Sequence, residues 1–138
     1  MSAEAQSSPG FRLPTGRITV LLGPDTARRG LLSRLDPGTA TGVLTVTSAR
    51  ERGTDERVAA LAQAAGHRPS LVLVDRLTDG LDAADRQTVL AELRTLAAAG
   101  PAVLVDDADP VAALAVADTA LRAGDDGSLR TESLGEVG

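Results

Sequence analysis

Residues 16–35 read GRITVLLGPDTARRGLLSRL, and residues 69–85 read PSLVLVDRLTDGLDAAD. The first stretch contains an uninterrupted apolar run, ITVLL at 18–22, that ends at Gly23. In the second stretch the run LVLVD, at 71–75, has the same character and ends in an Asp. Short runs of this kind are typical of strands that are buried on both faces of a sheet. Both stretches therefore predict a buried strand followed by a turn and a helix.

The rest of the chain continues this alternation of strands and helices. Further strands are predicted at 43–47, which is more exposed, at 102–106, and in a terminal hairpin of 119–123 and 128–131 around Asp125-Asp126-Gly127. Four helices are predicted. The first runs from a cap at Asp25 or Thr26 to Leu35, and the second from a Thr54 cap through 54–65 to Gly66. The third runs from an Asp82 cap to about Ala99, and the fourth from Asp109-Pro110 to about Ala117. Asp36-Pro37-Gly38 predicts a turn after the first helix.

This order predicts a three-layer α/β sandwich with a mainly parallel central sheet. The domain is expected to span residues 13–131, between a disordered lead-in at 1–12 and a flexible tail at 132–138.

Composition limits the classes of function. The net charge of −5 disfavours a general nucleic-acid binder, which needs a basic surface. The chain has no cysteine and a single histidine, His67, so thiolate and multi-histidine metal sites are excluded and His67 is expected on the surface. The polar N-terminus and the short apolar runs predict a cytoplasmic protein without direct membrane insertion. All 14 basic residues are arginines, a bias typical of a GC-rich bacterial genome.

The segment after the first strand aligns with a phosphate-binding loop but lacks its functional groups. The pattern G-x-x-x-x-G-K-[ST] supplies backbone N–H groups, a lysine and a magnesium-binding hydroxyl. Aligned on Gly23, this chain has Arg28 for the second glycine, Arg29 for the lysine and Gly30 for the hydroxyl residue. Because only the first glycine is retained, the sequence predicts a degenerate phosphate loop.

The order of segments resembles the ATP-binding (nucleotide-binding) domain of ABC transporters, in the P-loop NTPase superfamily. The similar stretches are 16–23, Pro37 and Gly42 with VLTV, RPSLVLVDRLTDGLDAADR at 68–86, AVLVDDADP at 102–110, VADTAL at 116–121 and DDGSL at 125–129. The resemblance covers about residues 16–129 and implies a P-loop NTPase-like fold that lacks the helical subdomain of the family, since few residues separate 43–47 from the next helix.

The resemblance also implies lost chemistry. Asp75 matches the Walker B Asp and Asp82 the D-loop Asp, while Arg76 stands where the catalytic Glu would be and Ala108 where the switch histidine would be. A guanidinium cannot act as a general base. Only Gly53 matches the signature motif, and no aromatic residue matches the adenine-stacking position. No catalytic residue and no metal ligand is therefore expected.

Several alternatives remain open at the level of sequence. Asp75 is either paired with Arg29 or Arg76, which would fill the phosphate position, or solvated at its strand end. Asp75, Asp106 and Asp107 could together hold magnesium, or nearby arginines could relieve their repulsion. Asp82 and Asp109 are most simply helix caps. Arg28 and Arg29 at a helix start could hold an anion. No cofactor is expected, although weak binding of ATP or ADP without well-ordered magnesium is conceivable.

The leading hypothesis is a pseudo-ATPase, a non-catalytic binding, scaffold or regulatory module derived from an ABC ATPase. The alternative is an ATP-binding subunit of an ABC-type transporter that binds nucleotide weakly and needs a competent partner ATPase. A third reading is a small regulatory or biosynthetic-cluster protein with an unrelated role. The first two hypotheses include a protein partner, either a second copy or another ABC-type protein, whose identity the sequence does not give.

Overall fold

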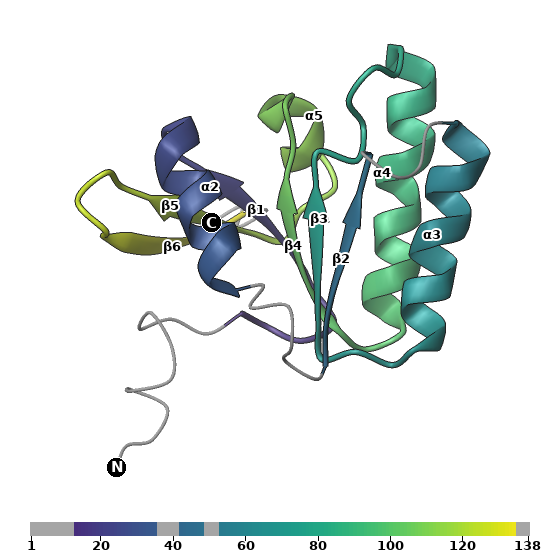
Figure 1. Ribbon diagram of the computed structural model, residues 1–138, viewed down its shortest axis with the longest axis horizontal. Coiled ribbons are helices and arrows are strands. Elements are labelled where there is room, and N and C mark those ends of the chain that lie inside the picture. The colour runs from purple at the N-terminus through teal and green to yellow at the C-terminus, as the bar shows by residue number, and fades with distance from the viewer. Residues whose placement is uncertain (1–12, 36–41, 49–52, 135–138) are drawn as a thin grey trace.

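Six strands form one mixed sheet in the order β2-β3-β4-β1-β5-β6 (Figure 1). The computed structural model describes residues 13–35, 42–48 and 53–134. The strands are β1 (Ile18–Leu22), β2 (Val43–Thr47), β3 (Leu71–Asp75), β4 (Ala102–Asp106), β5 (Thr119–Ala123) and β6 (Leu129–Ser133). All neighbouring pairs are parallel except β5 and β6, which form the predicted hairpin. The sheet is thus mainly parallel with an antiparallel edge.

Helices cover both faces of this sheet. They are α2 (Asp25–Leu35), α3 (Thr54–Gly66), α4 (Ala83–Ala98) and α5 (Pro110–Leu114). Leu73 and Leu104 pack with α2 on one face, whereas Val72 and Val103 pack with the other helices on the opposite face. Because successive side chains of a strand point to opposite faces, uninterrupted apolar runs fit this three-layer arrangement.

The helix boundaries refine the predictions. Asp82 caps α4, and its side chain accepts a hydrogen bond from the Asp85 N–H at 2.8 Å, as predicted. Asp109 likewise caps α5 and accepts from the Ala112 N–H at 3.2 Å. The predicted Thr54 cap is wrong, because Gly53 occupies the cap position and Glu56 accepts its N–H at 2.8 Å.

Other boundaries also shift. The helix α2 begins at Asp25 itself, α5 ends at Leu114 rather than near 117, and β6 continues to Ser133, into the predicted tail. The lead-in at 1–12 and the turn at 36–38 lie outside the described residues. None of the helices described here has the length and apolar character that crossing a bilayer requires.

Strand register brings two acidic residues to one level at the carboxyl edge of the sheet. Asp75 at the end of β3 is paired with Asp106 at the end of β4. The chain then turns sharply, and the Arg76 N–H donates to the Asp106 carbonyl at 2.7 Å. In parallel sheets this edge is where the following helices begin and where ligand sites are built. The candidate site is therefore at the ends of β1, β3 and β4.

Candidate functional site

The connection between β1 and α2 is much shorter than a phosphate-binding loop. Only Gly23 and Pro24 separate the two elements, and the Arg28 N–H donates to the Pro24 carbonyl at 3.0 Å as the first bond of the helix. A phosphate loop lies between its strand and its helix. Here α2 already covers Asp25 to Gly30, so these residues form helical turns.

The two glycines of this segment have different structural roles. Gly23 has φ +121°, and a Cβ on it would lie 2.1 Å from the carbonyl oxygen of Ala123. A glycine is therefore required there for the close approach of the end of β5. Gly30 lies on the exposed side of α2, and a Cβ on it would meet nothing within 4 Å. Its position is compatible with any helix-forming residue.

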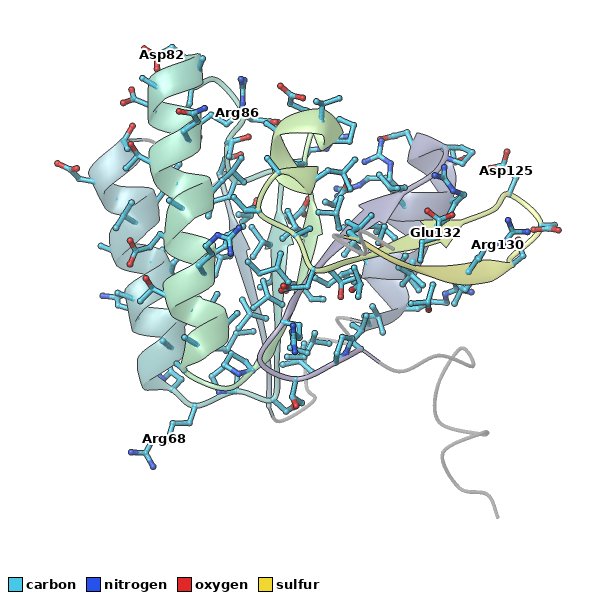
Figure 2. All side chains as sticks on the ribbon, turned by 180° about the vertical axis from the view of Figure 1, so that it is seen from behind. Arg68, Asp82, Arg86, Asp125, Arg130 and Glu132 are labelled. Atoms are coloured by element: carbon cyan, nitrogen blue, oxygen red, sulfur yellow. The ribbon has the colours of Figure 1, made fainter. Side chains whose placement is uncertain are left out.

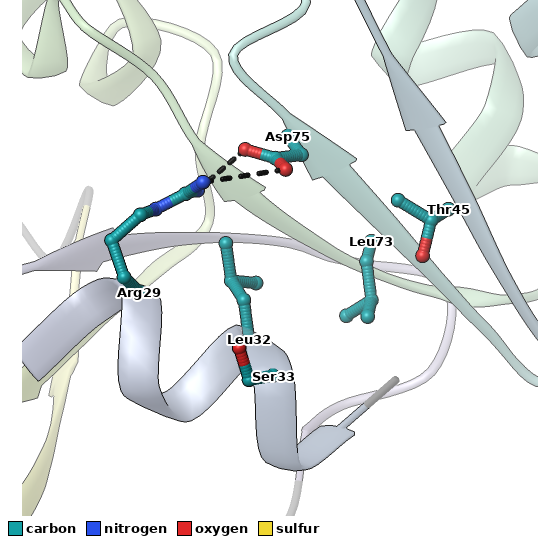
Figure 3. Close-up of a pocket in the computed structure, with 6 residues that line it drawn as sticks. All are labelled: Arg29, Leu32, Ser33, Thr45, Leu73 and Asp75. Atoms are coloured by element: carbon teal, nitrogen blue, oxygen red, sulfur yellow. Dashed lines mark hydrogen bonds and ion pairs between the residues drawn. The ribbon is translucent and has the colours of Figure 1, made fainter. Parts of the chain in front are cut away.

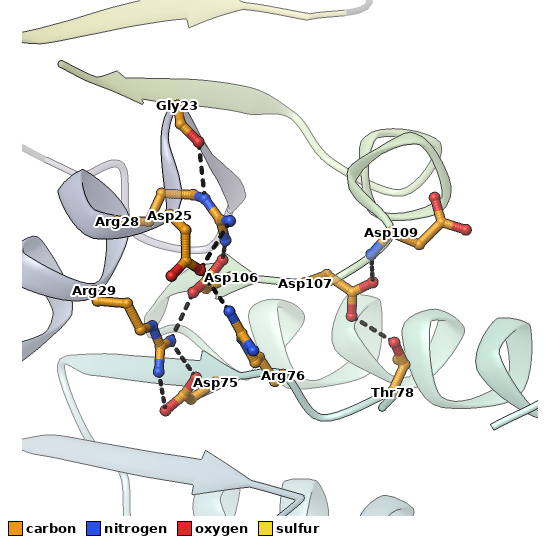
Figure 4. A network of polar contacts seen from close by, with 10 residues as sticks. All are labelled: Gly23, Asp25, Arg28, Arg29, Asp75, Arg76, Thr78, Asp106, Asp107 and Asp109. Atoms are coloured by element: carbon orange, nitrogen blue, oxygen red, sulfur yellow. Dashed lines mark hydrogen bonds and ion pairs between the residues drawn. The ribbon is translucent and has the colours of Figure 1, made fainter. Parts of the chain in front are cut away.

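Arg29 lies between the two carboxylates at the ends of β3 and β4 (Figure 4). Its Nη2 donates to Asp75 Oδ1 at 2.5 Å and to Asp106 Oδ2 at 2.7 Å. The hydrogen bond with Asp75 is the main reason that the pKa of Arg29 is raised above its ordinary value. Arg28 also pairs with Asp106, whose side chain is fully buried, and donates from Nε to the Gly23 carbonyl at 2.9 Å. The buried Asp106 charge is thus offset by two guanidinium groups.

A second layer of the same network is more exposed. Asp25 Oδ1 accepts from Arg76 Nη2 at 2.6 Å and from Arg28 Nη2 at 3.3 Å. Arg76 has φ +54°, a left-handed conformation that is uncommon for residues other than glycine. We call the whole network the ion cluster. It consists of Asp25, Arg28, Arg29, Asp75, Arg76 and Asp106.

The ion cluster decides between the alternatives that the sequence left open for Asp75. Its partner is Arg29, as one form of the prediction had it, whereas Arg76 pairs with Asp25 instead. The three guanidinium and three carboxylate groups cancel in formal charge. Across the part of the chain that the structure describes, no group of three or more His, Cys, Asp or Glu side chains is arranged to hold a metal ion.

Asp107 does not join Asp75 and Asp106, contrary to the idea of a triple-carboxylate magnesium site. It is buried and accepts from the Thr78 hydroxyl at 2.6 Å and from the Asp109 N–H at 3.0 Å. Burial raises the pKa of Asp107, and the hydrogen bond from Thr78 opposes that rise. Asp107 therefore ties the loop after β3 to the start of α5 rather than to the ion cluster.

Three other predicted positions are not members of the ion cluster. Asp82 is exposed at the start of α4 (Figure 2), where its side chain caps the helix. Ala108 is exposed beside α5, and His67 is on the surface, as predicted for it. Of the predicted phosphate-loop and Walker B positions, Gly23, Arg28, Arg29 and Asp75 are brought together.

Sequence reasoning missed one buried charged residue. Arg57 is only 5% exposed, and its Nη1 donates to the carbonyls of Leu77 and Asp79, each at 2.7 Å. It therefore holds the loop that follows β3. The available signal was its spacing, because Arg57 shares one face of α3 with the buried Leu61 and Ala64.

No protein-family model matches this sequence, and no curated protein matches it. Its fold is nevertheless similar to solved structures of ABC transporter ATP-binding subunits. A nucleotide-free ATP-binding cassette from an ABC transporter matches with a TM-score of 0.66 and 10% identity, over 89% of this chain and 83% of the other. cbiO1 from Clostridium perfringens, part of the ABC transporter complex cbiONQ, matches with 0.64 and 12%, over 89% and 79%.

A protein described as a metal-chelate-type ABC transporter, in an inward-facing conformation, matches with a TM-score of 0.63 and 16% identity, over 92% of this chain and 77% of the other. At these identities the similarity concerns the fold. The chain therefore has the P-loop NTPase-like fold of ABC ATP-binding subunits, which agrees with the resemblance found in its sequence.

Proposed function

We propose that this chain is a pseudo-ATPase, a non-catalytic binding or scaffold module on the fold of an ABC ATP-binding subunit. The ion cluster is the observation that carries the proposal. Arg29, at the position of the phosphate-binding lysine, is already bound to Asp75 and Asp106. The Nη2 donors of Arg29 are thus engaged inside the protein.

Electrostatics supports this proposal. A triphosphate binds where positive charge is in excess, whereas the ion cluster is balanced. If Arg29 turned to a phosphate, Asp75 and Asp106 would lose their shared partner beside a new anion. Two unit charges about 4 Å apart interact by about 4 kcal/mol near a protein surface. Repulsion of that order opposes nucleotide binding.

The backbone also supports it. In α2 the N–H of Arg28 bonds to Pro24, whereas in a phosphate loop such groups point at the phosphates. The residues present therefore do not fit a magnesium triphosphate, and we propose that the chain has no nucleotide cofactor. Hydrolysis is opposed further because Arg76, at the position of the catalytic Glu, is a cation paired with Asp25.

Residues 48–53 alone join β2 to α3, so we also propose that the helical subdomain is missing.

A second candidate is an ATP-binding subunit that binds nucleotide weakly and acts with a competent partner ATPase. The similarity of the fold to ABC ATP-binding subunits favours it, and one of these proteins, cbiO1, is part of a transporter complex. In both candidates the chain works through a protein partner, either a second copy or another ABC-type protein.

Isothermal titration with ATP and ADP, each with magnesium and with EDTA, separates the two candidates. The pseudo-ATPase predicts no heat of binding and no phosphate release, with an active ABC ATPase as the positive control. Saturable binding that depends on magnesium would favour the second candidate and refute the first. Sedimentation at high concentration tests the partner, because a pure monomer would exclude self-association and leave only another protein.

A further inference from the structure

The two outer strands of the sheet, β2 and β6, have different surroundings (Figure 1). Next to β2, a groove of about 260 Å³ lies between α2 and the strands β2 and β3 (Figure 3). Its polar end holds Arg29 and Asp75, which already bind each other. At the opposite edge, β6 pairs with β5, and no other described strand lies along its outer side. A strand in this position can pair with a strand of another molecule.

The hydrogen bonds of the hairpin show which main-chain groups of β6 point outward. The Gly124 N–H donates to the Ser128 carbonyl at 2.9 Å, at the tip of the hairpin. Hydrogen-bonded and non-hydrogen-bonded pairs alternate along an antiparallel ladder, so every second residue of β6 directs its main chain away from β5. The outward-pointing residues are Leu129, Thr131 and Ser133.

On the side-chain level, β6 carries opposite charges two residues apart. Arg130 and Glu132 therefore share one face of the hairpin (Figure 2). Glu132 Oε2 accepts from Arg122 Nε on β5 at 3.3 Å. Arg130 is exposed, lies directly opposite Arg122 and has no ion-pair partner among the described residues. Because like charges opposite each other are unfavourable, a carboxylate on the outer side of Arg130 would be stabilising.

A second copy of the chain supplies that carboxylate. A two-fold axis perpendicular to the sheet makes two β6 strands antiparallel. When the axis passes through Thr131, each Arg130 lies opposite Glu132 of the other copy, in the closer, non-hydrogen-bonded type of pair. The outward main-chain groups then meet each other, with Thr131 opposite Thr131 and Leu129 opposite Ser133. Opposite charges and facing threonines are both favourable cross-strand pairs.

Other antiparallel registers are disfavoured. A shift by one residue places outward-pointing main-chain groups opposite inward-pointing ones, so no ladder forms. A shift by two residues places either Arg130 opposite Arg130 or Glu132 opposite Glu132, and like charges repel. The register centred on Thr131 is therefore the one that satisfies both the hydrogen bonds and the charges.

We propose that two copies of this chain dimerise through β6, antiparallel and centred on Thr131, so that their sheets become continuous. This names the second copy as the partner that the proposed function leaves open, and it rests on that function only for the need for a partner. A monomer would overturn the dimer and leave the nucleotide titration unaffected, so the two failures are distinguishable.

Sedimentation equilibrium of the full-length protein measures the dimer. Because five residues form a small interface, we expect a reversible dimer with a Kd of about 10–100 μM. Arg130→Glu and Glu132→Arg each place like charges across both symmetric pairs and should weaken the dimer at least about tenfold. An equimolar mixture of these two variants restores opposite charges and should dimerise again. Arg94→Glu, exposed on α4, is the matched control for net charge and should leave the dimer unchanged.

A backbone variant tests the strand pairing itself. Thr131→Pro removes an N–H that points away from β5, which an outer strand tolerates, so the variant should fold, as judged by circular dichroism, but remain monomeric. In the unmodified protein, the Thr131 amide should exchange its hydrogen more slowly as the protein concentration rises. A pure monomer at about 1 mM, a dimer that Arg130→Glu or Thr131→Pro leaves intact, or a mixture of the two charge variants that stays monomeric would each overturn the proposal.

Discussion

Removing the guanidinium of Arg29 should destabilise the protein through the carboxylates that it leaves behind. Arg29→Met keeps a side chain of similar length but removes the charge that Asp75 and Asp106 share. Breaking one partner of a buried ion pair costs about 3–5 kcal/mol. Two features reduce this figure here, because Arg29 is 38% exposed and the buried Asp106 keeps its contact with Arg28. We therefore expect a loss of about 2 kcal/mol in the free energy of unfolding.

Urea denaturation followed by circular dichroism measures this loss, which corresponds to a fall of about 6–8 °C in Tm for a domain of this size. Arg34→Met is the matched control, since Arg34 is exposed in the last turn of the same helix and should change stability by less than about 0.5 kcal/mol. The double variant Arg29→Met with Asp75→Asn should recover about 1 kcal/mol, because it also removes one unpaired charge.

Two results would refute this reasoning. If Arg29→Met and Arg34→Met had equal stability, solvent would already screen the ion cluster. If Asp75→Asn destabilised the Arg29→Met protein further, Asp75 would stabilise the fold through contacts other than its pair with Arg29. Either result would also remove the main support for the view that the arginine takes the place of a bound ligand.

Three further predictions concern positions outside the Arg29 pair. Thr78→Val should lower the free energy of unfolding by about 1.5–3 kcal/mol at pH 7, because the ionised Asp107 loses a hydrogen bond. The Thr78 hydroxyl opposes the raised pKa of Asp107, so the loss of stability should become smaller as the pH falls through that pKa, which urea denaturation at several pH values would measure. Gly30→Ala should stabilise the protein by about 0.5–1 kcal/mol. Gly23→Ala should prevent normal folding, because its Cβ would collide with the carbonyl oxygen of Ala123; thermal unfolding measures both variants. Arg57→Met should speed amide exchange in the loop after β3 and cost about 2–3 kcal/mol, since two carbonyls lose a charged donor; unchanged exchange would contradict this.

The sequence was sufficient for the strands because each has a simple physical signature. The runs of β1 and β4 are apolar on both faces apart from Thr19 and the terminal Asp106, as is typical of a strand in a sheet covered on both faces. The Asp82 cap was equally readable, since a short carboxylate before a helix satisfies a free N–H. The pairing of Asp75 with an arginine was one of two alternatives that charge and position left open, and the structure shows it.

Features that depend on spacing in three dimensions were not accessible. The choice of Arg29 over Arg76 for Asp75 depends on where α2 begins, which differs from the predicted cap by a residue or two. The burial of Arg57 depends on carbonyl groups of a loop twenty residues away in sequence. Asp107 follows Asp106 directly, and successive residues at a strand end point to different sides. The sequence therefore indicated which charged residues lie near the site, whereas the structure was needed to show which of them pair.

The ion cluster supplies from within the chain the positive charge that its carboxylates require. Carboxylates at the ends of β3 and β4 repel each other unless a positive group lies between them, and in this chain Arg29 is that group. Because the counterion is covalently attached, no ligand is needed to offset the buried Asp106. Restoring the residues of the phosphate-loop pattern one at a time should consequently lower the free energy of unfolding before any ATP binds. Even Arg28→Gly with Arg29→Lys would leave α2 starting at Asp25, and calorimetry should still detect no magnesium-dependent ATP binding unless the backbone of this turn is also rebuilt.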